Sequence, residues 1–168
     1  MRPMVEIYLI RHAIAEERGE KWLDDTKRPL SADGIARMRK AAKGLERLGV
    51  HFDVVLTSPL VRTRQTADIV ASAYEHRPPI VLAESLAPEG EYADVLADLE
   101  KHAKRSRIAA VGHEPNIGEL AARLAGSRHR FAFRKGAVCR IDLASLPPAR
   151  PGTLRWFLPP GVLRAIRK

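Results

Sequence analysis

The sequence has little cysteine and no long apolar run. Cys139 is the only cysteine among 168 residues, so no disulfide can form within the chain, which is typical of a reducing compartment such as the cytoplasm. No apolar run approaches the roughly 18 residues needed to span a bilayer. The apolar stretch at residues 4–10 contains Glu6 and precedes no small-residue cleavage site, so it is interpreted as a strand and not as a signal peptide. These absences predict a cytoplasmic protein without a membrane segment.

Aromatic residues are also scarce, at 5% of the chain, and no recognition helix or base-stacking platform is evident. The charge, in contrast, is strongly positive, because 29 Lys and Arg against 20 Asp and Glu give +9 with neutral histidines. The hydrophobic content of 45% is sufficient for a core. The basic excess therefore indicates an anionic partner, with nucleic acid as the weaker choice.

Strand-like and helix-like segments alternate along the chain. This alternation predicts a single domain over residues 1–168, an α/β protein built as a three-layer α/β/α sandwich with a largely parallel central sheet. Strands are predicted at 5–10, 53–57, 78–82, 107–111, 137–143 and 154–158. Helices are predicted between the N-cap Ser31 and Gly49, from the N-cap Ser58 and first-turn Pro59 to about Tyr74, over 92–103, and directly after Pro115.

Residues suited to binding anions follow three of the predicted strands. Arg11 and His12 end the first, Ser58 follows the second with Arg62 shortly behind it, and His113 follows the strand at 107–111. The carboxyl ends of parallel strands meet at one edge of a sheet, where ligands bind. Helix N-termini favour anions, and arginine forks match phosphate oxygens. The pattern predicts a phosphate pocket that contains two imidazoles.

Each of these residues alone has a structural explanation. A single histidine at a strand end is more often structural than functional, and Arg62 taken alone could be an exposed helix residue. Their joint placement at equivalent ends of three strands favours the functional interpretation.

Four segments in order match known motifs. Residues 8–12 end in Arg-His, with Ala13 in the place of a glycine, and residues 28–34 read R-P-L-S-x-x-G. Residues 58–67 read S-P-x-x-R-x-x-Q-T-A, and residues 111–113 read V-G-H. Together they resemble the histidine phosphatase (phosphoglycerate-mutase-like) superfamily. The short chain and its W-F-L-P segment at 156–159 are most similar to the compact SixA-type phosphohistidine phosphatases.

The resemblance implies a phosphoglycerate-mutase-like fold and hydrolysis through a covalent phosphohistidine, with no metal or cofactor. His12 would be the nucleophile, and Arg11, Arg62 and His113 would hold the phosphoryl oxygens. Glu84, in a Leu-x-Glu segment, would be the general acid that protonates the leaving oxygen; the alternative is an exposed loop acid. A phosphohistidine substrate would need this acid less, because imidazole is a better leaving group than an alkoxide.

A basic segment, residues 128–135, precedes the predicted strand at 137–143. Near the pocket mouth it would attract an acidic protein surface or a polyanionic small molecule; a solvated loop is an equal alternative. Lys135 is the candidate phosphate contact in this segment, and Ser58 is a second such candidate.

The favoured substrate is phosphohistidine in a protein, which would place the chain in signal transduction. The alternatives are a broad-specificity phosphomonoesterase for small phosphorylated metabolites, or a phosphate- or partner-binding module without turnover. A cysteine phosphatase is excluded, since Ser145 stands where its arginine would follow Cys139, and no G-x-x-x-x-G-K-[ST] loop is present. The lack of long insertions favours a monomer.

Overall fold

One six-stranded sheet organises the protein. The computed structural model describes residues 4–167, and its strands lie in the order β3-β2-β4-β1-β5-β6. The strands β3, β2, β4 and β1 pair in parallel with one another, whereas β5 pairs antiparallel with both β1 and β6. These pairings confirm a largely parallel sheet. The strands are β1 (Val5–Arg11), β2 (Val54–Thr57), β3 (Ile80–Leu82), β4 (Arg107–Gly112), β5 (Val138–Leu143) and β6 (Thr153–Leu158).

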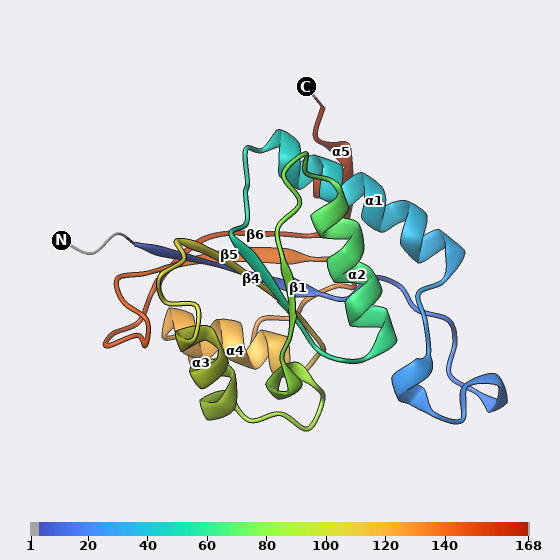
Figure 1. The fold of residues 1–168 in the computed structure, drawn as a ribbon, viewed down its shortest axis with the longest axis horizontal. Helices are drawn as coiled ribbons and strands as arrows, with labels where there is room; N and C mark the ends of the chain where they lie inside the picture. The colour runs from blue at the N-terminus through green and yellow to red at the C-terminus, as the bar shows by residue number, and fades with distance from the viewer. Residues whose placement is uncertain (1–3, 168) are drawn as a thin grey trace.

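Helices cover both faces of this sheet (Figure 1). On one face lie α1 (Ala32–Arg47), α2 (Val61–Ser72) and α5 (Pro160–Ala165); on the other lie α3 (Tyr92–Glu100) and α4 (Asn116–Ala125). Successive side chains of a strand point to opposite faces, so Ile7 and Leu9 pack with α3 and α4, whereas Tyr8 and Ile10 pack with the other three helices. The two hydrophobic clusters confirm the three-layer architecture.

The ends of α1 agree with the predicted signals. The Ser31 side chain accepts a hydrogen bond from the Gly34 N–H at 3.0 Å, which makes it the N-cap. Gly49, just after the helix, has a φ of 75°, a left-handed conformation that glycine adopts without strain.

The predicted start of the second helix is wrong. α2 begins at Val61 with Leu60 as its cap residue, because Ser58 and Pro59 form a separate turn in which the Ser58 hydroxyl accepts from the Leu60 N–H. The third predicted helix ends at Glu100 and not at Ala103. The six-residue α5 has no counterpart among the predicted helices, since it is too short to show a helical period.

Short 3-10 turns complete the connections: η1 (Glu20–Trp22), η2 (Asp25–Lys27) and η3 (Glu84–Leu86). The first two belong to a long excursion between β1 and α1, seen at the lower right of Figure 1. Cys139 is fully buried. Within residues 4–167, no helix is long and apolar enough to cross a membrane.

Candidate active site

The carboxyl ends of β1, β2 and β4 lie side by side. The register pairs Arg11 of β1 with Gly112 of β4, and the end of β2 with Val111. His12 and His113 are the next residues after β1 and β4; their ring centroids are 5.3 Å apart and both side chains are buried. Arg62, in the first turn of α2, is 3% exposed. The predicted convergence of two histidines and two arginines is therefore present.

The backbone carbonyl of Ala13 fixes the tautomer of the His12 ring. Its Nδ1 lies 2.7 Å from the carbonyl oxygen of Ala13, and since a carbonyl only accepts, this nitrogen carries the proton. The Ala13 N–H in turn donates to Thr66 Oγ1 at 3.1 Å, which fixes the backbone beside the ring. Nε2 of the neutral ring is thus left with its lone pair.

Burial lowers the pKa of His12 to about 3, and the positive charges of Arg62 and Arg11 act in the same direction. The hydrogen bond to the Ala13 carbonyl opposes this shift without reversing it. His12 is consequently a neutral imidazole at physiological pH, which is the state that a nucleophile requires.

His113 contacts Ser58, one of the predicted phosphate-binding residues. Nε2 of His113 lies 2.8 Å from Ser58 Oγ, and Nδ1 is buried without a hydrogen-bond partner in residues 4–167. Burial lowers the pKa of His113 to about 4, with a further contribution from the charge of Arg62. A bound phosphoryl group would reverse part of this shift, because its negative charge stabilises the protonated ring.

Arg62 is held by a carboxylate that the sequence did not indicate. Asp25 of η2 accepts from Arg62 Nη2 at 3.0 Å through Oδ2, and its carbonyl oxygen accepts from Nη1 at 2.8 Å. Its other carboxylate oxygen accepts from Nε of Arg28, also at 2.8 Å. Asp25 thus joins two buried arginines from different segments.

Arg28 is the functional candidate that the sequence analysis missed. It belongs to the R-P-L-S motif, for which the sequence predicted no role in the pocket, yet it is 6% exposed and its charge contributes to lowering the pKa of His113. A buried cation that neighbours a predicted phosphate pocket is unusual enough to indicate a role. The signal was an arginine placed directly before the apolar Pro29-Leu30 pair.

The arginines retain unused donors. Arg11 Nη1 donates to the Phe133 carbonyl at 2.7 Å, but Nε of Arg11 and Nε of Arg62 are buried without partners in residues 4–167. Buried polar atoms are normally paired. Phosphoryl oxygens are suitable acceptors for both groups, which agrees with the predicted anion pocket.

The two less central candidates lie at the margin of this cluster. Glu84, in η3, is exposed, and the following Ser85 and Leu86 line, together with His113, a hollow of about 340 Å³. Lys135 is exposed, but its side chain is partly desolvated, and this desolvation together with the charge of Arg11 lowers its pKa. The roles of both residues remain predictions.

The basic residues of the predicted segment 128–135 differ in whether they form ion pairs. Arg130 forms an ion pair with Glu114 at 2.8 Å, whereas Arg128, Arg134 and Lys135 have no ion pair within residues 4–167. Over the same residues, no three His, Cys, Asp or Glu side chains are grouped in a way that could hold a metal ion.

Comparisons with known proteins agree on one family. The family model of the histidine phosphatase superfamily (branch 1) matches residues 7–88. An uncharacterized protein of Picosynechococcus sp. is 38% identical over 138 residues, which are 80% of this chain and 82% of the relative. The phosphohistidine phosphatase SixA of Escherichia coli K12 is 26% identical over 161 residues, covering 93% of this chain and 94% of that protein.

A solved structure of the protein histidine phosphatase SixA with tungstate superimposes with a TM-score of 0.84 and 25% identity. The match covers 95% of this chain and 99% of the SixA chain. The residues 7–88 matched by the family model contain Arg11, His12 and Arg62. The chain belongs to the histidine phosphatase superfamily and is a phosphatase.

Proposed function

We propose that this phosphatase hydrolyses phosphohistidine on a protein, without a metal ion, through a covalent phosphohistidine on His12. The observation that carries the proposal is the state of the His12 ring. It is buried and neutral, its Nδ1 proton is engaged by the Ala13 carbonyl, and its Nε2 lone pair is available beside Arg11 and Arg62.

In the first step, Nε2 of His12 attacks phosphorus and forms the P–N bond of the phosphoenzyme. The bond to the substrate nitrogen breaks, and its electron pair stays on the substrate imidazole. Arg11, Arg62 and His113 hold the phosphoryl oxygens and stabilise the charge of the transition state. In the second step, water attacks phosphorus, the P–Nε2 bond breaks, and its electron pair returns to His12 as orthophosphate leaves.

The leaving group supports phosphohistidine over a phosphate ester. Glu84, the candidate general acid, is exposed, and its side chain forms no hydrogen bond within residues 4–167. An alkoxide requires protonation as it leaves, whereas an imidazole is a much better leaving group. The likeness to a phosphohistidine phosphatase over most of both chains supports the same choice.

The second candidate is a phosphomonoesterase for small metabolites, which is favoured by the hollow beside His113. Its volume of about 340 Å³ lies in the range of small-molecule sites. However, Glu89, Glu91 and Glu119 line this hollow, and only Arg123 provides a positive charge among its lining residues. Such a lining disfavours an anionic metabolite, so we place this function second. A binding module without turnover is disfavoured because Arg11, Arg62 and the two histidines of the pocket are all present. We also expect the protein to be cytoplasmic.

The test compares a phosphohistidine-bearing protein with an artificial phosphomonoester, in excess chelator. We expect hydrolysis of the P–N bond to persist with the chelator and to be lost in His12→Ala, with His51→Ala, an exposed histidine away from the site, as the matched control. Activity that survives in His12→Ala would refute the covalent mechanism. Glu84→Gln should reduce ester hydrolysis and spare P–N cleavage; an equal loss on both substrates would assign Glu84 another role.

A further inference from the structure

A basic groove lies next to the phosphate pocket. It has a volume of about 920 Å³ and runs between α1, α5 and the loop at 134–136. Its basic side chains come from all three elements: Arg37 of α1, Arg134 and Lys135 of the loop, and Arg164 of α5. The fifth basic residue of the lining is Arg11, which also belongs to the phosphate pocket.

The groove is anchored to the catalytic end of β1. The Gly136 N–H donates to the carbonyl oxygens of both Arg11 and His12, each at 3.1 Å. The loop that carries Lys135 is therefore hydrogen-bonded to the backbone of the proposed nucleophile, His12, and of Arg11, which would hold the phosphoryl oxygens.

The charge of the groove is only partly neutralised. Among residues 4–167, no acidic side chain lines it, although Asp33 at its margin pairs with Arg37 at 2.7 Å. Arg134, Lys135 and Arg164 have no ion pair within the described residues. Desolvation lowers the pKa of Lys135, and the charges of Arg11 and Arg28 act in the same direction.

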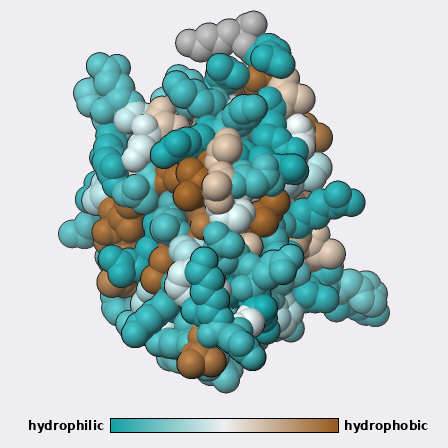
Figure 2. Space-filling model, turned by 90° about the vertical axis from the view of Figure 1, so that its right-hand side faces the viewer, coloured by the Kyte–Doolittle hydropathy of each residue, from teal (hydrophilic) through white to brown (hydrophobic). Residues whose placement is uncertain are grey.

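The floor between these charges is small and apolar. Ala13, Gly34, Met38 and Gly136 form part of it, so a chain can lie close to the protein while its side chains reach the basic residues on both sides. Figure 2 shows the right-hand face of the molecule, where hydrophilic side chains dominate and hydrophobic ones form separate small groups.

We propose that the groove binds an acidic segment next to the phosphohistidine of the protein substrate. This inference rests on the proposed function, and it identifies the substrate as an acidic phosphoprotein. The charges come from three separate elements around an open groove, which suits a chain with spaced carboxylates better than one compact anion. The volume of the groove, about 920 Å³, also exceeds what a single phosphoryl group would fill.

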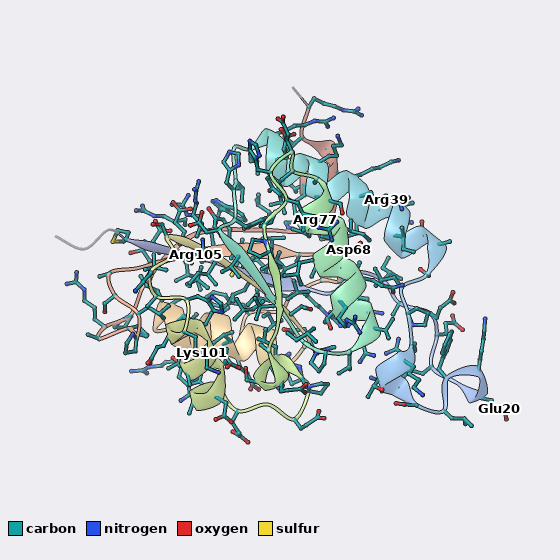
Figure 3. The ribbon with its side chains drawn as sticks, viewed as in Figure 1. Glu20, Arg39, Asp68, Arg77, Lys101 and Arg105 are labelled. Carbon is teal, nitrogen blue, oxygen red and sulfur yellow. The ribbon has the colours of Figure 1, made fainter. Side chains whose placement is uncertain are left out.

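The experiment uses two synthetic phosphohistidine peptides of equal length, one flanked by glutamates and the other by glutamines at the same positions. The groove variant is Arg134→Glu with Arg164→Glu. The matched control is Lys104→Glu with Arg105→Glu, which makes the same change in net charge with two exposed residues. Figure 3 shows Arg105 on the left, at the opposite end of the sheet from the excursion marked by Glu20.

We expect the unchanged protein to cleave the glutamate peptide with a kcat/KM about tenfold higher than that of the glutamine peptide, at low salt. The preference should disappear in the groove variant and persist in the control variant, and hydrolysis of an artificial phosphomonoester should be unchanged in both. An unaltered preference in the groove variant, or an equal loss on both peptides and the ester, would overturn the proposal.

A binding measurement separates this proposal from the proposed function. Fluorescence anisotropy with the unphosphorylated peptides tests the groove even if no P–N bond is cleaved. Tighter binding of the glutamate peptide, lost only in the groove variant, would support the groove. Equal binding of the two peptides would refute it, and citrate that binds as tightly as the glutamate peptide would indicate a small polyanion and refute the peptide assignment.

Discussion

Replacement of Gly34 by alanine should disable the active site through the backbone. Gly34 lies in the first turn of α1, and a Cβ at this position would stand 2.0 Å from the carbonyl oxygen of Ile14. That oxygen is held by the Ser31 N–H at 3.0 Å. Ile14 follows Ala13, whose carbonyl fixes the His12 ring, so relief of the clash moves the segment that orients the nucleophile.

The size of the effect follows from this distance. Real Cβ atoms essentially never approach another heavy atom below 3.0 Å, so the Ile14 carbonyl and the helix must separate from 2.0 Å by about 1 Å or more. A displacement of about 1 Å in a catalytic group can cost about 10²-fold in rate. The cost in stability is about 1–3 kcal/mol for overpacking, offset by about 1 kcal/mol of alanine helix propensity.

Gly44 provides a matched control on the same helix. A Cβ there would stand 2.0 Å from the carbonyl oxygen of Leu163 in α5. This clash is as severe as the one at Gly34, but it involves α5 and not the segment that carries His12. We expect both variants to lower Tm by up to roughly 8 °C and by similar amounts, measured by calorimetry. Only Gly34→Ala should lower kcat/KM for an artificial phosphomonoester by about 10²-fold. Full activity in Gly34→Ala, or an equal loss in Gly44→Ala, would refute the reasoning.

Three other outcomes concern the buried rings. Because the pKa of His12 is lowered to about 3, kcat/KM, corrected for ionisation of the substrate, should be constant from pH 8 to about 5 and fall only in stronger acid; a midpoint near 6.5 would contradict this. Unfolding exposes His12 and His113 to protonation at their ordinary pKa near 6.5. The folded protein therefore loses stability as the pH falls, by about 2 kcal/mol per ring at pH 5, which thermal melts at pH 7 and pH 5 would detect; equal Tm values would argue against neutral rings. Ser58→Ala should lower kcat about tenfold through loss of a hydrogen bond worth about 1–1.5 kcal/mol to His113, and an unchanged kcat would show that Ser58 does not position this ring.

The sequence was sufficient to place the central four residues. Arg11, His12 and His113 directly end or follow predicted strands, and Arg62 lies in the first turn of the helix after another. Parallel strands in one sheet must bring their carboxyl ends together, so position along the chain translated into position in space. The alternation of strands and helices determined the three layers for the same reason, since each element had to bury one apolar face.

The sequence was not sufficient for contacts between segments that lack a period. Ser58 looked like a helix cap, yet its hydroxyl contacts His113, which lies 55 residues further along the chain. Asp25 lies in a short 3-10 turn, and its link between Arg28 and Arg62 depends on how the excursion folds back.

The basic groove is a further feature that the sequence alone could not predict. Each of its elements contributes one or two basic residues that, in sequence, look like ordinary surface charges. Only the packing of α5 against α1, with the 134–136 loop anchored on Arg11 and His12, places Arg37, Lys135 and Arg164 around one hollow. By itself, the sequence determined which residues are chemically capable, because residue type and strand position are local properties. The tertiary structure alone decided which charges act together, because electrostatic attraction depends on distances between segments that are remote along the chain.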